Sequence, residues 1–399
     1  MPKILLLENP HTIADETFLR YGYEVQRISG ALDEDDLIAA LADVDMLGIR
    51  SKTMVTERVL EASQHLTAVG TFSIGTNQID LHAAAERGIA VFNAPYSNTR
   101  SVVEMVIAEM IMLTRNIPRH DKELQKHSWK KTSEGSHEVR GKTIGIIGYG
   151  SIGTQVSVVA EALGMNVIFY DIAEKLAIGN ARRVHNLDEL LEEADVVTLH
   201  IDGRASNTGF FSREMFEKMK HGAIFLNLAR GSLVDVEALR EKLLDGSLEG
   251  AGVDVFPEEP NNNDEPFDSP LLGIPNTVLT PHIGGSTLEA QESIGQYVSA
   301  KLMHYAAIGA TEMSVNIPNI TVPMDEPLHR VAWIHHNTPG ALARVNNLFS
   351  DAGINVTYQS LATDGDMGYM ITDTSSPITA EAIAELEKST AHIRVRVVR

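Results

Sequence analysis

The chain has 399 residues, of which 43% are hydrophobic and 22% are charged, so it is long enough for two or three globular domains. Its formal net charge of −21 argues against binding to nucleic acid or to an anionic membrane surface, and any anionic substrate must be captured by local Arg or Lys side chains. It contains no cysteine, which excludes disulfides and thiolate chemistry. The N-terminus lacks the pattern of a signal peptide, and we expect a cytoplasmic protein.

The first hundred residues alternate between short apolar runs and helical stretches. Strands are expected at 3–7, 24–28, 46–49, 67–70 and 89–92, with helices such as 33–44 and 56–63 between them. This alternation is typical of right-handed crossovers that build a parallel sheet. We therefore predict a doubly wound, flavodoxin-like α/β domain. The most apolar predicted helix comes next, near 102–113, and it carries Glu104 and Glu109, so we expect a core helix and not a membrane span.

A second alternating series begins at residue 142 and predicts a second doubly wound domain, of the Rossmann type. Its strands are expected at 142–147, 166–170, 195–201, 223–228, 250–256 and 276–280. A long amphipathic helix then follows Ser286 and could return to the first domain.

The alternation of strands and helices typical of a parallel sheet ends near residue 316. Three prolines within 316–327 indicate a linker. Strands at 330–336, 354–363, 367–373 and 392–398 alternate with helices at 341–353 and 379–388. The order β-α-β-β-α-β predicts a ferredoxin-like α+β module.

One stretch carries the pattern of a dinucleotide-binding turn. Gly148, Gly150 and Gly153 form a GxGxxG motif that follows a predicted strand and opens an amphipathic helix. Gly148 permits a tight turn, Gly150 lets a pyrophosphate approach the backbone, and Gly153 lets helix and strand pack closely. The helix N-terminus, at Ser151 and Ile152, offers free N–H groups and the positive end of its dipole to the phosphates.

Asp171 ends the next predicted strand, eighteen residues after Gly153. A carboxylate there can accept hydrogen bonds from the adenosine ribose hydroxyls. A 2′-phosphate would meet a like charge, so NAD is predicted in preference to NADP. The alternative is a series of helix-packing glycines with an incidental aspartate.

Three polar residues follow three consecutive strand ends of this second domain: Arg230, Glu259 and His282. In an open parallel sheet, ligands bind outside the carboxyl ends of the strands. The trio suits oxidation of a 2-hydroxy acid, with His282 accepting the hydroxyl proton and Glu259 orienting its imidazole and raising its pKa. Arg230 would clamp the substrate carboxylate as a fork. Taken singly, each residue could instead serve a turn or a surface loop.

At these residues the sequence resembles the D-2-hydroxyacid dehydrogenase family, and Arg230, Glu259 and His282 stand at the positions of its catalytic triad. The motifs that carry the resemblance are GYGSIG (148–153), LARGSLVD (228–235), GVDVFPEEP (252–260) and LTPHIGGST (279–287). A further set is similar to the branch of the family that acts on D-3-phosphoglycerate: IRSKT (49–53), SIGTNQIDL (73–81) and VFNAPYSNTRSVVE (91–104).

That resemblance implies NAD-dependent oxidation of D-3-phosphoglycerate to 3-phosphohydroxypyruvate, the first step of L-serine biosynthesis. A side activity on 2-oxoglutarate is also expected, because it too is a 2-oxo acid with a second anionic group. Arg50 and Ser51 follow a predicted strand and would bind the substrate phosphate, although Arg50 could instead form a surface salt bridge. The loop at Gly75 would offer backbone N–H groups to the substrate, and Asn98 is assigned to the same substrate site together with Arg230.

The resemblance also implies the remaining cofactor contacts and the domain limits. The contacts to NAD would come from Leu228, Ala229, Arg230, Asp254, His282, Ile283, Gly284 and Gly285. The substrate-binding domain would comprise 1–97 and 286–325, the NAD-binding domain 98–285 and the regulatory domain 326–399.

The C-terminal module resembles the ACT regulatory domain of that branch. By this resemblance, His335, Asn337 and Asn355 would bind L-serine as a feedback inhibitor, at the interface between two ACT domains. The resemblance suggests a homotetramer built through ACT–ACT and NAD-domain contacts, to which Trp129 could contribute an anchor or be only partly buried. The linker departs from the family, because Glu326 and Pro327 stand where a Gly-Gly pair is common and a proline should stiffen the joint.

Two alternative functions remain open from the sequence. One is a D-2-hydroxyacid dehydrogenase acting on lactate, glycerate or 2-hydroxyglutarate, and the other is an NAD-sensing corepressor that reuses the fold. The histidines show no metal-binding spacing, so no metal site is predicted.

Overall fold

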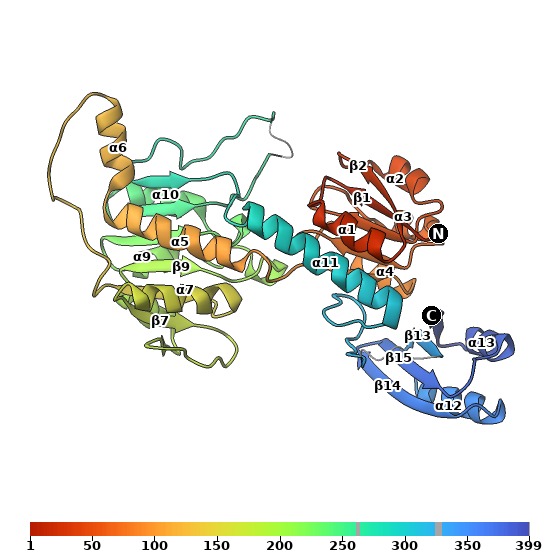
Figure 1. Ribbon diagram of the computed structural model, residues 1–399. Coiled ribbons are helices and arrows are strands. Elements are labelled where there is room, and N and C mark those ends of the chain that lie inside the picture. Colours follow the sequence, from red (N-terminus) through yellow and green to blue (C-terminus); the bar gives the residue numbers. More distant parts are fainter. Residues whose placement is uncertain (261–263, 324–328, 399) are drawn as a thin grey trace. The chain divides into compact units, whose positions relative to one another are not determined.

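The computed structural model describes residues 1–260, 264–323 and 329–398. The chain divides into two compact units, one made of Met1–Ser97 with Gln291–Arg399 and the other of Asn98–Ala290 (Figure 1). The predicted stiff joint at Glu326 and Pro327 lies outside the described residues.

The first unit contains a five-stranded parallel sheet in the order β2-β1-β3-β4-β5. Its strands are β1 Lys3–Leu7, β2 Glu24–Ile28, β3 Met46–Ile49, β4 Ala68–Thr71 and β5 Ala90–Phe92. Its helices are α1 Ile13–Arg20, α2 Glu34–Ala40, α3 Glu57–Ala62, α4 Leu81–Glu86 and α11 Leu288–Ile308, whose first residues belong to the second unit. The predicted flavodoxin-like order is confirmed. The helix expected over 33–44 is shorter and ends at Ala40.

The second unit contains a seven-stranded parallel sheet in the order β12-β11-β10-β9-β6-β7-β8. Its strands are β6 Thr143–Ile147, β7 Asn166–Tyr170, β8 Arg182–Arg183, β9 Val196–Leu199, β10 Ala223–Asn227, β11 Leu248–Val253 and β12 Thr277–Leu279. Its helices are α5 Thr99–Thr114, α6 Ile117–Gln125, α7 Ser151–Ala162, α8 Leu187–Glu193, α9 Arg213–Lys218 and α10 Val236–Leu244. The two-residue strand β8 was not predicted, because two arginines give no apolar run.

The predicted Rossmann fold is confirmed by this strand order. The chain runs outward from β6 to β7 and β8, then crosses back to β9 on the other side of β6. Neighbouring loops leave the sheet in opposite directions at such a switch point, which opens a crevice at the carboxyl ends of β6 and β9. The glycine motif at 148–153 follows β6 and therefore borders this crevice.

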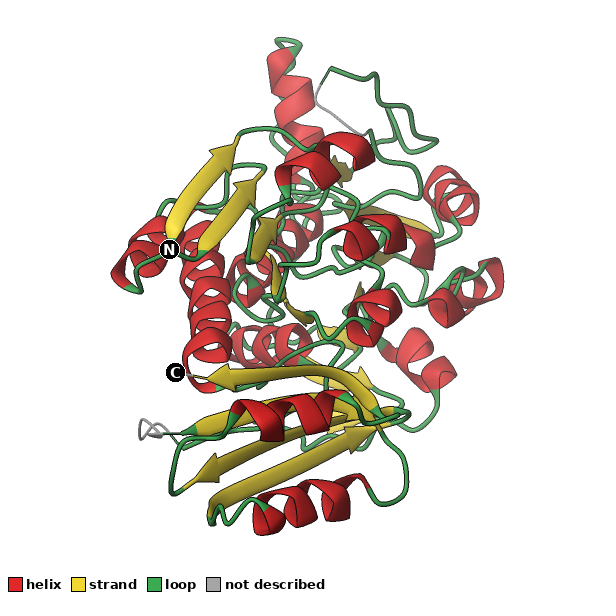
Figure 2. Cartoon of the chain, turned by 90° about the vertical axis from the view of Figure 1, so that its right-hand side faces the viewer, coloured by secondary structure: helices red, strands yellow, loops and turns green. Residues whose placement is uncertain are grey.

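The C-terminal module is a four-stranded antiparallel sheet in the order β14-β15-β13-β16, which confirms the predicted ferredoxin-like pattern (Figure 2). Its elements are β13 Arg330–His336, α12 Ala341–Asp351, β14 Val356–Asp364, β15 Met367–Thr374, α13 Ala380–Glu387 and β16 His392–Val398. Trp333 is 1% exposed and packs in the core of the module.

The module shares a core with the rest of the first unit. Tyr369 and Ile371 of β15 pack in the same buried cluster as Met303 and Tyr305 of α11. The Tyr369 hydroxyl donates to the carbonyl oxygen of Gly309, and the Arg330 guanidinium donates to the carbonyl oxygen of Ile308 at 2.8 Å. Because apolar and polar contacts are both made, the module is joined to this unit by packing as well as by the chain.

No helix among the described residues has both the length and the apolar character needed to cross a membrane. The side chain of Trp129 is 81% exposed within its own unit.

Candidate active site

Polar residues line one edge of the seven-stranded sheet. The strands are parallel, so all their carboxyl ends lie at that edge. Each strand from β12 to β7 is followed by a polar residue or a glycine turn. Taken in sheet order, these are His282, Asp254 with Glu259, Arg230, Asp202, the glycine turn and Asp171.

His282 is hydrogen-bonded to Glu259. Its Nδ1 lies 2.8 Å from the Glu259 carboxylate, and the imidazole is 48% exposed. A carboxylate only accepts hydrogen bonds, so Nδ1 carries the proton and Nε2 keeps its lone pair free. His282 has a φ of 54°, a left-handed conformation that is uncommon for a residue with a side chain. The conformation is held by hydrogen bonds from its backbone N–H to the carbonyl oxygens of Asp254 and Thr280.

Each of the two groups stabilises the charged form of the other. The hydrogen bond that His282 donates to Glu259 raises the pKa of His282, although burial opposes the rise. Burial acts to raise the pKa of Glu259, but the bonds from His282 and from the Phe256 N–H outweigh it and lower that pKa. Arg230 influences the pKa of both, which places all three predicted triad members within electrostatic range of one another.

The turn that carries Arg230 is in backbone contact with the turn that leads to Glu259. A Cβ at Gly231 would stand 2.0 Å from the carbonyl group of Phe256, so only glycine fits there. The buried Asn227 side chain donates to the Arg230 carbonyl and accepts from the Ala229 N–H, which fixes the turn. The predicted contact residues Leu228 and Ala229 are both buried in this segment.

Asp254 is buried and holds the His282 turn in place. Its carboxylate accepts from the Thr280 hydroxyl at 2.6 Å and from the N–H groups of Ile283 and Gly284, both at 2.8 Å. Three hydrogen bonds satisfy most of the carboxylate and fix the backbone on either side of His282. Asp254 was predicted as a cofactor contact, and its hydrogen bonds show that it also acts as a positioning group.

Gly285 and Asn98 approach each other closely, and both were predicted site residues. A Cβ at Gly285 would stand 2.1 Å from the Asn98 amide nitrogen. The amide oxygen of Asn98 is buried and has no hydrogen-bond partner among the residues that the structure describes. It therefore keeps an acceptor that a bound molecule can use.

The glycine turn after β6 fits a dinucleotide. A Cβ at Gly148 would stand 2.5 Å from the His200 carbonyl oxygen, and one at Gly153 would stand 2.2 Å from the carbonyl oxygen of Gly148. Nothing lies within 4 Å of a Cβ at Gly150, so a pyrophosphate can reach the backbone there. Gly150 precedes α7 without any side-chain cap, which leaves the N–H groups of Ser151 and Ile152 for phosphate.

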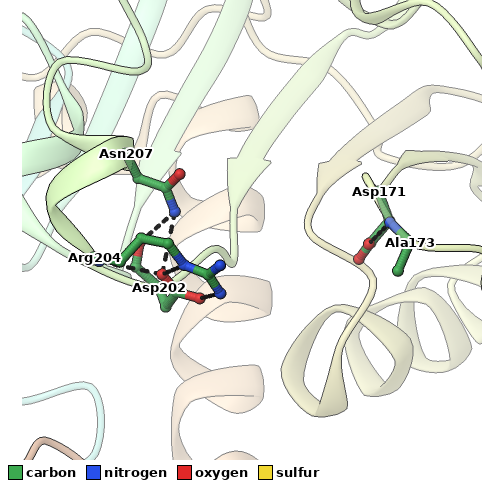
Figure 3. A network of polar contacts seen from close by, with 5 residues as sticks. All are labelled: Asp171, Ala173, Asp202, Arg204 and Asn207. Atoms are coloured by element: carbon green, nitrogen blue, oxygen red, sulfur yellow. Dashed lines mark hydrogen bonds and ion pairs between the residues drawn. The ribbon is translucent and has the colours of Figure 1, made fainter. Parts of the chain in front are cut away.

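Asp171 stands at the end of β7, where the adenosine ribose is expected. Its carboxylate accepts from the Tyr149 N–H and from the Ala173 N–H, both at 2.8 Å, and Figure 3 shows the second contact. The carboxylate is thus held in one orientation and keeps lone pairs for the ribose hydroxyls.

A loop that the sequence analysis missed lies beside Arg230. Asp202 follows β9 and binds Arg204 through two side-chain contacts, while Asn207 donates to the Asp202 carbonyl (Figure 3). Gly203 packs on the aliphatic part of Arg230, where a Cβ would stand 2.8 Å from its Cγ. The loop therefore supports the Arg230 side chain, and the signal for it was a strand end followed by Asp, Gly and Arg.

Glu109 is a second residue that the sequence analysis did not assign. It lies on the buried face of α5 and is 2% exposed, and neither carboxyl oxygen has a hydrogen-bond partner among the described residues. Burial raises the pKa of Glu109 to about 8, and the nearby Asp254 adds to the rise. Gly252 makes room for it, because a Cβ there would stand 2.2 Å from a Glu109 oxygen. The carboxyl is therefore neutral at physiological pH.

In the first unit, Glu8 organises the loop that carries Arg50 and Ser51. Its carboxylate accepts backbone N–H groups from all four residues of 50–53, at 2.8 to 3.4 Å. Burial acts to raise the pKa of Glu8, but these hydrogen bonds outweigh it and lower that pKa. Glu8 thus binds the backbone N–H groups of this loop. The groups of Arg50 and Ser51 that could contact a ligand are therefore their side chains. Gly75 lies in an open loop, where a Cβ would have no neighbour within 4 Å.

The three predicted effector residues do not come together within one chain. Asn337 lies beside the β14–β15 turn, where its amide donates to the Gly365 carbonyl at 3.1 Å. Asn355 lies at the other end of β14, where its carbonyl accepts from the Ser375 N–H at 2.9 Å. β14 has nine residues, so the two asparagines are roughly 25–30 Å apart.

His335 belongs to the Asn337 end of the sheet. It is 1% exposed, stacks on Trp333 at 4.3 Å between ring centres, and has a buried Nε2 without a partner among the described residues. Both asparagines are exposed, so they are the accessible members of the predicted effector set.

Comparison with known proteins agrees with this geometry. Residues 107–284 match the model of the D-isomer specific 2-hydroxyacid dehydrogenase NAD binding domain, and residues 331–391 match the AHAS small subunit-like ACT domain. The D-3-phosphoglycerate dehydrogenase of Haemophilus influenzae is 46% identical over 99% of this chain and 97% of its own length. The chain belongs to the D-isomer specific 2-hydroxyacid dehydrogenase family.

Other members of this dehydrogenase family are also similar to the chain in sequence or in structure. The D-3-phosphoglycerate dehydrogenase of Escherichia coli K12 is 44% identical over 99% of this chain and 97% of its own length. The D-lactate dehydrogenase of Aquifex aeolicus, solved with NAD and lactic acid, superposes with a TM-score of 0.65 at 25% identity and covers 76% of this chain and 95% of its own. As a member of the family, the chain is an NAD-dependent dehydrogenase with an ACT domain.

Glu259→Gln should shift the pH dependence of hydroxy acid oxidation. Oxidation needs a neutral His282, so the rate rises with pH through the pKa of His282. Glu259 raises that pKa, so its removal should move the acid limb of kcat/KM to lower pH and lower the plateau. Glu258→Gln, at the exposed neighbouring position, is the control. An unchanged acid limb in Glu259→Gln would contradict the assignment.

Glu109→Gln should remove a pH dependence of stability. The native carboxyl keeps its proton up to a pKa of about 8, whereas the unfolded chain releases it near its ordinary pKa of about 4.3. Between these values the parent should lose stability relative to the variant as pH rises, by up to about 1.4 kcal/mol per pH unit. Thermal unfolding followed by circular dichroism measures the difference.

The control for that measurement is Glu104→Gln on the same helix, where the exposed carboxylate pairs with Arg100 at 2.7 Å. Its stability difference from the parent should stay nearly constant from about pH 5 to about pH 8. A Glu109→Gln difference that is equally constant would mean that Glu109 is ionised in the native protein.

Proposed function

We propose that this protein oxidises D-3-phosphoglycerate to 3-phosphohydroxypyruvate, the first step of L-serine biosynthesis. The observation that carries the proposal is the hydrogen bond between His282 and Glu259 within electrostatic range of Arg230. The names of relatives that match nearly the whole chain support the choice of a phosphorylated substrate.

In the proposed reaction, His282 is the general acid and base, and Arg230 binds the substrate carboxylate. Bound NAD supplies the hydride acceptor. Nε2 of His282 takes the proton from the substrate hydroxyl, and Glu259 stabilises the imidazolium that forms. In the reverse direction the same nitrogen returns the proton to the keto oxygen. Arg230 binds the substrate carboxylate as a planar fork, held in place by Asn227 and by the 202–207 loop.

The substrate phosphate is assigned to Arg50 and Ser51, with Gly75 and Asn98 as further substrate contacts. Support comes from the loop at 50–53, whose backbone N–H groups are all taken by Glu8. The Arg50 guanidinium has no ion-pair partner among the described residues, so it is free to bind a dianion. We include 2-oxoglutarate as a side substrate, because it is also a 2-oxo acid with a second anionic group.

L-serine is the proposed effector, and the site would be completed by two copies of the chain. Support comes from the ACT-domain match and from the position of Asn337 and Asn355 at opposite ends of one sheet. Side-by-side pairing of two ACT domains about a twofold axis can bring Asn337 of one copy to Asn355 of the other. We extend this to a homotetramer, in which the exposed Trp129 of the NAD-binding domain is a contact.

Arg50→Ala should separate phosphorylated from unphosphorylated substrates. Loss of a charge-assisted contact to phosphate should lower kcat/KM for 3-phosphohydroxypyruvate by roughly 10- to 100-fold and spare an unphosphorylated 2-oxo acid that has a single carboxylate. NADH absorbance measures both rates. Arg58→Ala is the control, since Arg58 is exposed and pairs with Glu34 and Asp35. Equal losses on both substrates would remove Arg50 from the phosphate site, and no turnover of 3-phosphohydroxypyruvate by the parent would refute the substrate.

Asn337→Ala and Asn355→Ala should each abolish most of the inhibition by serine, measured as the ratio of rates with and without it. If one site needs both residues from different copies, refolding the two variants together should restore part of the inhibition, because mixed pairs contain one intact site. Asn347→Ala, exposed on α12, is the control and should keep the parent response. A mixture that stays insensitive would contradict the shared site.

A further inference from the structure

Two adjacent arginines of β8 have different surroundings. Arg182 points to α8 and forms ion pairs with Glu189 and Glu193. Arg183 pairs in the sheet with Phe169 and turns its guanidinium toward the end of β7. There its Nη2 lies 3.3 Å from the carbonyl oxygen of Asp171 and 3.1 Å from that of Ala173. Arg183 therefore lies at the adenosine end of the NAD site.

The charge of Arg183 is poorly compensated. Its only ion-pair contact among the described residues is Glu174, at 4.0 Å, and the Glu174 side chain is 95% exposed. Such an exposed pair contributes little. The side chain of Arg183 is 23% exposed, and its Nε is buried without a hydrogen-bond partner in the described part of the chain. The guanidinium thus keeps donors that the protein itself does not use.

The nearby Asp171 carboxylate does not neutralise it. That carboxylate is turned toward the N–H groups of Tyr149 and Ala173, as Figure 3 shows for Ala173. Arg183 contacts only the backbone of Asp171. A fixed negative charge and an uncompensated positive charge therefore stand side by side where a ribose 2′-substituent would lie.

We propose that Arg183 is a latent binding group for a phosphate monoester on the adenosine ribose, and that the charge of Asp171 alone keeps it from being used. A guanidinium binds phosphate through parallel N–H donors. Asp171 repels the same phosphate and accepts from a free 2′-hydroxyl, so the present pair selects NAD. Selectivity between the two nucleotides then rests on two residues, of which Arg183 supplies the capacity to bind NADP. This inference depends on the cofactor and not on the proposed substrate.

The test is equilibrium binding of NADH and NADPH to the full chain, followed by their fluorescence. Asp171→Asn keeps the size of the side chain and removes its charge. It should improve the NADPH-to-NADH affinity ratio by roughly 10- to 100-fold. Adding Arg183→Gln should cancel most of that gain. Adding Arg182→Gln, at the neighbouring arginine, should change the gain by less than about twofold, because Arg182 points to α8.

The NADPH-to-NADH affinity ratio compares two cofactors on the same variant. A substitution that weakens the binding of both cofactors equally therefore leaves the ratio unchanged. A second measurement avoids altering Arg183 at all. On Asp171→Asn, adenosine 2′,5′-bisphosphate should displace NADH better than adenosine 5′-phosphate does, and the preference should shrink as salt is added. No such preference, or equal effects of Arg183→Gln and Arg182→Gln, would overturn the proposal. Failure of the serine-pathway substrate assay would leave this result untouched.

Discussion

The hydrogen bond between Nδ1 of His282 and the Glu259 carboxylate is the contact on which the active site depends. It fixes which ring nitrogen is free, and it determines the pKa at which that nitrogen can take a proton. The bond exists because three loops meet at one edge of a parallel sheet. Gly231 lets the Arg230 turn touch the backbone before Glu259, and the left-handed conformation of His282 aims its ring at the carboxylate.

Buried carboxylates perform a common task in both units. Glu8 collects four backbone N–H groups of the loop that carries Arg50, and Asp254 collects two N–H groups and a hydroxyl from the turn that carries His282. In each case the cost of burying a charge is offset by several hydrogen bonds to one loop. These hydrogen bonds fix the backbone of the loop that carries the functional side chain. Glu109 is the exception, because it has no such partners in the described chain and stays protonated.

The sheet of the ACT module separates two of the proposed effector residues. Its antiparallel strands place Asn337 and Asn355 at opposite ends of β14, although only eighteen residues separate them in sequence. Helix α12 lies between the two asparagines along the chain and returns the backbone to the far end of the sheet. In the serine site that we propose, a ligand that contacts both residues would therefore contact two chains.

The sequence by itself determined the layers, the parallel sheets and the three candidate catalytic residues. Apolar runs at the spacing of crossovers identify parallel sheets, and parallel sheets bring polar residues after their strands to one edge, which is why Arg230, Glu259 and His282 could be found without coordinates. The tertiary structure decided what depends on contacts between distant segments. These include the N–H groups gathered by Glu8, the protonated Glu109 behind Gly252 and the guanidinium of Arg183 beside the backbone of Asp171. The physical reason is that burial and hydrogen bonding set the charge state of a side chain, and neither can be read from the residues next to it in the chain.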